Sequence, residues 1–180
     1  MKNKIYHGPI NVSGSGGYIS KYLRSKGYIS DFVVWYDFGM RRNYDYNLEL
    51  NKYNLFKKLF IIFYNFLIAF IKYDIFHFYY GRSLLPFGLD LPFLKLFGKK
   101  IIMTYCGSEV RLVGHIESKR NPYAYLLKFG PDNPKYDNQK IMKIKWHSFW
   151  CNKIIAYRDC YDSAIFAGNE NKVFKYPWIQ

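Results

Sequence analysis

Three short segments of this sequence combine residue types that could bind a ligand, and the first is rich in glycine and serine. Residues 13–17 read Ser-Gly-Ser-Gly-Gly, and small side chains let a ligand approach the backbone. A helix is predicted directly afterwards, so the amides of Ser15, Gly16 and Gly17 are the predicted anion contacts. No Gly-Lys-Ser/Thr follows, which excludes a P-loop, and Ile19 stands where a dinucleotide fingerprint has its third glycine. The alternative is a tight turn that needs small residues.

The second segment, residues 77–82, follows a predicted strand to its end. The two-residue period of a strand places His77 and Tyr79 on the same face. A histidine among aromatic residues on a strand is more often a buried core residue than a ligand-binding one. Tyr80 and Arg82 lie beyond the strand and are the better candidates for ligand contacts.

The third segment follows the fourth predicted strand. Gly107 allows a sharp exit from the strand, and Ser108 could cap a short helix. Glu109 and Arg111 bring both signs of charge to the strand end. A nucleophilic role for Cys106 would require a lowered thiol pKa, and no Gly-x-Cys-x-Gly elbow is present. The alternative is a capped loop that carries a surface ion pair.

Cysteine and histidine spacing predicts no metal site. Cys106, Cys151 and Cys160 form an odd set without a Cys-x-x-Cys pair, which indicates a reducing compartment and no structural zinc. His115 and His147 have no His-x-x-His or His-Glu-x-x-His context. The sequence also enters its first predicted strand directly, so no signal peptide is predicted.

Apolar strands alternate with helices along the chain. Residues 32–35 are apolar throughout, which is typical of a parallel sheet covered on both faces. The predicted strands span residues 4–7, 30–36, 74–79, 99–105, 152–157 and 172–176. The predicted helices span 18–26, 55–72, 89–97, 139–150 and 159–166, and Asp159 is the predicted cap of the last one. Residues 37–51 and most of 123–138 are predicted loops. This alternation predicts a Rossmann-like doubly wound α/β fold, with a mainly parallel sheet and helices on both faces. Ligands on such sheets bind beyond the carboxyl ends of the strands, where the three segments lie.

The net charge of +14, from 27 basic and 13 acidic residues, favours anionic partners such as nucleic acid, acidic lipid head groups or phosphorylated ligands. Lysine used only as a surface residue is the alternative. Residues 59–71 are apolar apart from Asn65, but this run is shorter than the roughly 20 residues that span a bilayer. Lys57, Lys58 and Lys72 flank the run, which leaves a role at a membrane surface open.

Several motifs occur in an order that matches one family. They are Gly16-Gly17 before a helix that ends Leu-Arg-Ser-Lys-Gly, Tyr-Asp-Ile-Phe-His-Phe at 73–78, Leu-Phe-Gly-Lys-Lys-Ile-Ile-Met-Thr-Tyr at 96–105, Gly-Ser-Glu-Val-Arg at 107–111, Asn-Lys-Ile-Ile-Ala at 152–156 and Tyr-Pro at 176–177. Together they resemble the N-terminal domain of family 4-type glycosyltransferases with the GT-B architecture. The resemblance covers nearly the whole chain.

The resemblance implies that residues 1–180 form a single acceptor-side, Rossmann-like domain that ends at an interdomain connector. A second domain would hold the nucleotide-sugar donor, including the basic residues for its diphosphate and a paired-glutamate motif. Ser15, Gly16 and Gly17 would then contact the donor diphosphate across an open recess. The acceptor and the transferred sugar would lie near Tyr80, Arg82, Cys106, Gly107, Ser108, Glu109 and Arg111.

Two positions depart from the family pattern. Cys106 stands where members often have histidine, and Glu109 stands where aspartate is commoner. The cysteine puts any proton or hydrogen-bond role of that position in doubt. No catalytic residue is assigned from the sequence, and the resemblance implies transfer without a metal or a cofactor, the nucleotide sugar being a substrate.

The expected function is therefore transfer of a sugar from a nucleotide sugar to a surface-polysaccharide or lipid-linked glycan acceptor, with a second domain needed for activity. The expected location is the cytoplasm, at the inner face of the plasma membrane as a peripheral protein. A donor-domain subunit and an anionic membrane are further candidate partners, and nucleic acid is not, because only charge and aromatic content favour it.

Two alternatives remain open. The chain could be a non-catalytic binding or scaffold half of a split or truncated enzyme. It could also be a dinucleotide-binding α/β protein, because Asp37 follows Gly17 by the twenty residues typical of a ribose-binding acid, although the third glycine is missing.

Overall fold

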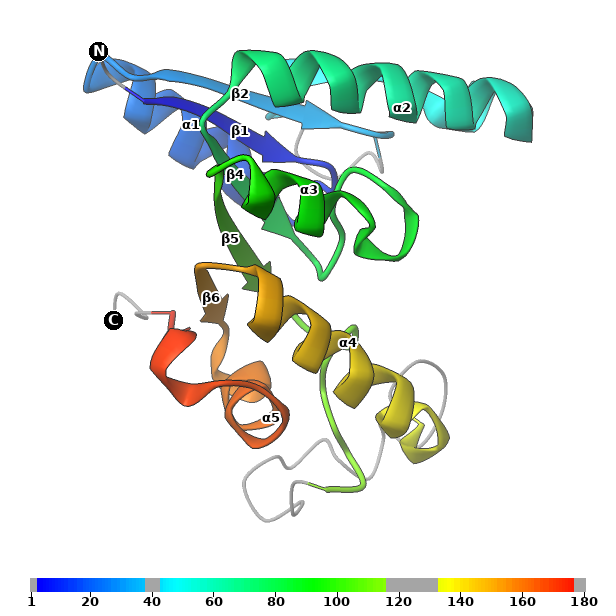
Figure 1. The fold of residues 1–180 in the computed structure, drawn as a ribbon, viewed down its shortest axis with the longest axis vertical. Helices are drawn as coiled ribbons and strands as arrows, with labels where there is room; N and C mark the ends of the chain where they lie inside the picture. Colours follow the sequence, from blue (N-terminus) through cyan, green and yellow to red (C-terminus); the bar gives the residue numbers. More distant parts are fainter. Residues whose placement is uncertain (1–2, 38–42, 116–132, 177–180) are drawn as a thin grey trace. The chain divides into compact units, whose positions relative to one another are not determined.

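A computed structural model describes residues 3–37, 43–115 and 133–176. Its strands form a parallel sheet in the order β3-β2-β1-β4-β5-β6-β7, which confirms the predicted Rossmann-like α/β class. Figure 1 shows β2, β1 and β4 side by side. The strands are β1 (Lys4–Gly8), β2 (Ile29–Val34), β3 (Tyr46–Asn47), β4 (Ile75–Tyr79), β5 (Lys100–Tyr105), β6 (Lys153–Ala156) and β7 (Val173–Lys175). The helices are α1 (Ser15–Ser25), α2 (Leu55–Lys72), α3 (Asp90–Leu96), α4 (Asp137–Trp150) and α5 (Arg158–Ala167), with short 3-10 turns at Leu50–Lys52, Pro86–Gly88, Pro134–Tyr136 and Glu170–Lys172.

The chain divides into two compact units, residues 1–102 and 103–180. In the first unit β1 lies between β2 and β4, and His7 is in register with Phe32 on one side and His77 on the other. Side chains alternate along β1. Tyr6 faces α2, where Asn65 donates a hydrogen bond to its hydroxyl at 3.2 Å, and His7 faces the opposite side of the sheet, which α1 covers.

Most predicted elements are confirmed, and α2 has the predicted bounds, but three details were wrong. Helix α1 begins at Ser15, so the glycines predicted as turn residues lie in its first turn. The predicted loop 37–51 contains β3, which is held by pairing with Val33 and Val34 of β2, a long-range interaction with no local pattern. Helix α5 has Tyr157 at its N-cap position, so Asp159 lies inside the helix and is not its cap.

In the second unit, β6 pairs in parallel with β7, and α4 and α5 pack against them. Helix α4 buries Ile144, His147 and Ser148. The Tyr105 hydroxyl at the end of β5 hydrogen-bonds to His147 Nδ1 at 3.0 Å, which fixes α4 against the strand end. Within the described ranges no helix is long and apolar enough to cross a membrane.

Candidate functional site

The glycine-rich loop before α1 is closed by its own hydrogen bonds. The Gly14 amide donates to Asn11 Oδ1 at 2.8 Å, and the amides of Ser15 and Gly17 donate to the carbonyls of Val12 and Gly14, both at 3.1 Å. Gly14 has a left-handed backbone, with φ of 76°, which a glycine adopts without strain. Two of the three amides predicted to contact an anion, those of Ser15 and Gly17, therefore already have partners inside the loop.

The two glycines at the start of α1 serve packing. A Cβ atom on Gly16 would lie 2.9 Å from the ring of Phe32, and a Cβ on Gly17 would collide with the backbone carbonyl of Asn43. Helix α1 therefore lies closer to β2 and to the segment after it than a residue with a side chain at position 16 or 17 would allow. Both glycines are buried on this side and do not line an open recess there, so the predicted phosphate contact stays a prediction and would have to use backbone amides.

Asp45 holds in place the segment that covers Gly17. Its backbone N–H donates to the Phe32 carbonyl at 2.9 Å, and its carboxylate accepts from the Phe32 N–H at 2.8 Å. Arg24 of α1 binds the same carboxylate with two nitrogen atoms, at 2.8 and 2.9 Å. Bidentate pairs of this kind fix geometry as well as charge. These hydrogen bonds and the ion pair therefore fix the segment that covers Gly17.

A buried histidine pair lies beside this packing. The Tyr79 hydroxyl is 3.1 Å from Nδ1 of His7 and 3.1 Å from Nδ1 of His77, and the Tyr79 ring packs edge-on against Phe32. Burial lowers the pKa of His7 to about 4, and burial with the neighbouring His7 lowers the pKa of His77 well below its usual range. Both rings are therefore neutral at pH 7. The interpretation of His77 as a core residue is confirmed, whereas the partnership with His7 was not foreseen.

The turn after β4 separates the two candidates that the sequence placed there. Tyr80 is half-buried and packs against the apolar cluster of Ile10, Trp35, Leu50 and Ile62. Arg82 is exposed. The structure therefore leaves their predicted ligand contacts as predictions.

The loop after β5, in the second unit, is organised around Glu109. Its carboxylate Oε1 accepts the Cys106 N–H at 2.6 Å, and the Val110 amide donates to the Gly107 carbonyl at 3.3 Å. The Cys160 thiol lies 3.3 Å from the same Gly107 carbonyl. The loop is therefore a compact turn that the Glu109 carboxylate closes, and the predicted capping role of Ser108 stays a prediction.

Helix α4 holds the other side of this loop with two lysines. Lys140 Nζ donates to the Arg111 carbonyl at 2.7 Å, and Lys143 Nζ donates to the Glu109 carbonyl at 3.4 Å. Lys140 is buried, which an ammonium group tolerates only when it has hydrogen-bond acceptors. The loop and the first half of α4 therefore form one structural element.

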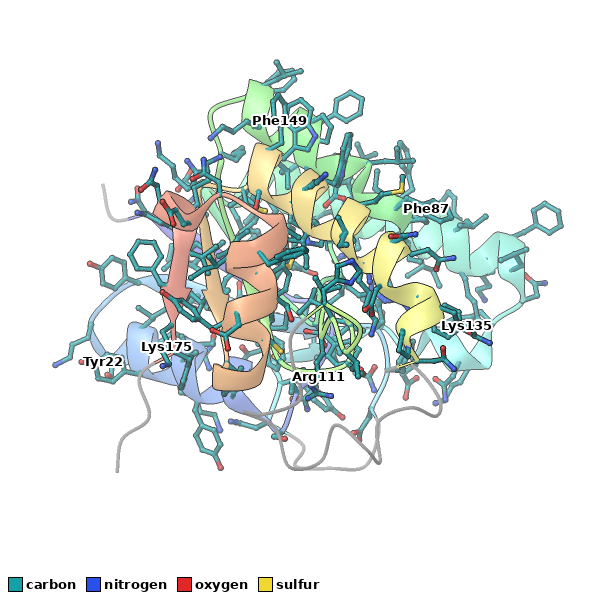
Figure 2. All side chains as sticks on the ribbon, turned by 90° about the horizontal axis from the view of Figure 1, so that it is seen from below. Tyr22, Phe87, Arg111, Lys135, Phe149 and Lys175 are labelled. Atoms are coloured by element: carbon teal, nitrogen blue, oxygen red, sulfur yellow. The ribbon has the colours of Figure 1, made fainter. Side chains whose placement is uncertain are left out.

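A pocket of about 490 Å³ opens between the loop and α4. Ligand pockets commonly have volumes of about 300–1,000 Å³. The residues that line it are Ser108, Glu109, Asn133, Lys135, Tyr136, Gln139, Lys140 and Lys143. The lining thus combines amide, hydroxyl, carboxylate and ammonium groups with one aromatic ring. Figure 2 labels Lys135, beside the start of α4, and Arg111, in the loop after β5.

Glu109 is the electrostatically unusual member of the pocket. It is 8% exposed, and its Oε2 atom has no hydrogen-bond partner. Burial raises its pKa, although the Cys106 amide and the charge of Lys143 oppose that shift. A buried oxygen without a partner is costly and is satisfied when a donor reaches it. A ligand hydroxyl is such a donor, so Glu109 can bind a hydroxyl or exchange a proton with it.

Of the predicted site residues, the structure brings Ser108 and Glu109 into this pocket. Gly107 and Arg111 lie beside them in the same loop: the nearest atoms to a Cβ on Gly107 would be an Arg111 guanidinium nitrogen and Glu109 Oε2, both at 3.8 Å. Cys106 takes part through its backbone N–H, which donates a hydrogen bond to Glu109 Oε1.

The sequence interpretation missed the pocket residues of α4 and the turn before it. Their signal was present, because positions 136, 139, 140 and 143 fall on one helix face. The predicted helix 139–150 contains three of these four positions, but the sequence does not show that this face meets the loop.

Comparison with known proteins does not identify this chain: no protein-family model matches it, and no curated protein matches it significantly. In the residues that the structure describes, no group of three or more His, Cys, Asp or Glu side chains is placed to hold a metal ion.

Proposed function

We propose that the protein is the acceptor-side part of a glycosyltransferase and that the pocket beside Glu109 binds a phosphorylated glycan or lipid-linked sugar. The supporting observation is the combination of a buried carboxylate that has an oxygen without a partner with three lysines around one pocket. Sugar hydroxyls donate to carboxylates, and phosphate oxygens accept from ammonium groups. The pocket adjoins the loop that follows the carboxyl end of β5, where ligands of parallel sheets bind.

In this proposal Glu109 binds the acceptor hydroxyl and takes its proton as the sugar is transferred. A general base acts best when its pKa lies near the working pH, so the raised pKa of Glu109 suits this role. Lys135 and Lys143 bind the phosphate of the acceptor. The sugar donor is bound by a second domain, and the protein works at the inner face of the membrane, where lipid-linked acceptors are found.

Calorimetric titration with glucose 1-phosphate, a soluble sugar phosphate, tests the pocket. Lys135→Gln should weaken binding roughly tenfold, because a charge-assisted hydrogen bond is lost. Lys145→Gln is the matched control, since Lys145 is exposed on α4 and is not part of the pocket lining. Equal binding by wild type and Lys135→Gln would contradict the assignment.

A transfer assay tests whether this chain needs a separate donor-binding domain for activity. Incubation with UDP-glucose and a lipid-linked acceptor should give product only when a donor-binding domain is supplied, and Glu109→Gln should abolish that product while glucose 1-phosphate still binds. Robust transfer by this chain alone would contradict an acceptor-side role.

Dinucleotide binding is the second candidate, and the sheet favours it. The order 3-2-1-4-5-6 is the one found in dinucleotide-binding folds. Asp37, the candidate ribose contact, accepts a hydrogen bond from the Tyr44 hydroxyl at 3.2 Å. Titration with NAD and with UDP-glucose separates the two functions, because a dinucleotide-binding protein should bind NAD more tightly.

A further inference from the structure

The outward face of α2 is apolar along its whole length. The helix packs on the first unit through Ile62, Phe66 and Ala69. A helix docked on one side normally has polar residues on the other. Here the outward positions are large and apolar, and Phe56 and Ile71 are 85% and 82% exposed. Other exposed side chains on this face are Phe60, Phe63, Tyr64 and Ile68.

The same surface continues onto α3. The rings of Phe70 in α2 and Phe97 just after α3 pack edge to face, with centroids 5.1 Å apart. Phe93 and Leu96 of α3 are exposed, and so is Phe87, which precedes the helix. We name these exposed residues of α2 and α3 the α2–α3 surface. Monomeric soluble proteins rarely expose an apolar patch of this kind, and such patches mark interaction sites.

The rim of the α2–α3 surface is cationic. Helix α2 contains no Asp or Glu and carries Lys57 and Lys58 in its first turn. The ammonium group of Lys99 lies over the ring of Phe70, 5.4 Å from its centroid. The one acidic residue of α3, Asp90, is buried and accepts a hydrogen bond from the Ser83 hydroxyl.

We propose that the α2–α3 surface docks on an anionic lipid bilayer, with α2 lying flat at the level of the head groups. Aromatic and aliphatic side chains would enter the acyl boundary, while the flanking lysines would reach anionic phosphates. The charges favour this occupant over a second copy of the chain, because two copies of net charge +14 with lysine-rimmed faces would repel each other. This inference does not depend on the proposed function.

Co-sedimentation with vesicles tests the proposal. The protein should bind phosphatidylcholine vesicles that contain phosphatidylglycerol, bind pure phosphatidylcholine vesicles more weakly, and lose affinity for the anionic vesicles as salt is raised. Absence of binding to the anionic vesicles would overturn the proposal.

Matched variants locate the binding surface. Phe60→Ser should weaken partitioning into anionic vesicles roughly tenfold, because the variant lacks the phenyl ring that would be buried in the bilayer. Phe149→Ser in α4 is the control, since Phe60 and Phe149 are both 69% exposed and each packs against one neighbouring ring. An equal loss from both variants would overturn the assignment to α2. Each of Lys57→Gln and Lys58→Gln should weaken binding about fivefold.

An insertion measurement separates a bilayer from a protein partner. A Phe56→Trp variant should gain fluorescence that is quenched by brominated phosphatidylglycerol lipids, since its ring would lie among acyl chains. Quenching no greater than that of the wild-type tryptophans would overturn the proposal. So would a dimer in solution that dissociates in the Phe60→Ser variant while vesicle binding stays unchanged.

Discussion

The loop before α1 and the loop after β5 are built from similar residues but have opposite roles in packing. Both combine glycine and serine at the end of a parallel strand. Before α1, Gly16 and Gly17 allow the helix to press against Phe32 and Asn43, so the chain itself fills the space. After β5, a Cβ on Gly107 would have no neighbour closer than 3.8 Å, and a pocket adjoins the loop.

The difference shows that glycine identifies a place of close approach without identifying what approaches. Before α1 the approaching group is the protein's own backbone, held by Asp45 and Arg24. After β5, Lys140 and Lys143 of α4 donate hydrogen bonds to carbonyls of the loop, and Glu109 is one of the residues that line the pocket beside it.

The largest expected effect comes from adding one methyl group at each loop. Gly17→Ala should lower the free energy of unfolding by about 3 kcal/mol or more, because the new Cβ would overlap the Asn43 carbonyl, which cannot rotate away. Gly107→Ala should leave the free energy of unfolding unchanged or raise it by up to about 1 kcal/mol. The new methyl group has space in the folded protein, and alanine restricts the unfolded chain more than glycine does. Urea denaturation measures both, and equal stability of the two variants would remove the contrast.

Acid sensitivity tests the packed region. His7 has a folded-state pKa of about 4 against an ordinary value of 6.5, so the unfolded chain binds more protons in that interval. The contribution of neutral His7 to the free energy of unfolding is complete above pH 6.5 and is lost as pH falls toward 4. It amounts to roughly 3 kcal/mol. His7→Gln should therefore flatten this part of the stability curve, as followed by urea denaturation at each pH. An unchanged curve would mean that the His7 ring is not buried away from water in the folded protein.

The smallest expected effect has the opposite sign and tests the open loop. The pKa of Glu109 is raised, so its contribution is complete below its ordinary pKa and is lost as pH rises through the folded-state value. Its magnitude should be below that of His7, because the Cys106 amide and Lys143 both favour the charged form. The difference between the pH–stability curves of wild type and Glu109→Gln measures it. A difference that grows with pH in favour of the wild type would contradict the burial of this carboxylate.

Much of the fold could be predicted because its signals are local. The apolar run 32–35 and the helix at Leu55–Lys72 each fix an element through spacing alone, and the alternation of strands and helices predicted the parallel class. Strand β3 could not be predicted, since two residues carry no periodicity and pairing with Val33 and Val34 creates it.

The candidate site was predictable only in part. Glu109 was identified because a charged residue after a parallel strand lies at the edge where ligands bind. Its partners on α4 were missed because they lie more than twenty residues further along the chain, and the sequence does not show which helix face meets the loop.

The sequence by itself determined the class of the fold, the cationic charge and the apolar length of α2, because these depend on composition and on spacing within one element. Only the tertiary structure decided that the glycines before α1 are covered, that Glu109 lines a pocket, and that one apolar side of α2 is packed while the other is exposed. These outcomes depend on which distant residues meet, and the packing of the whole chain sets those meetings.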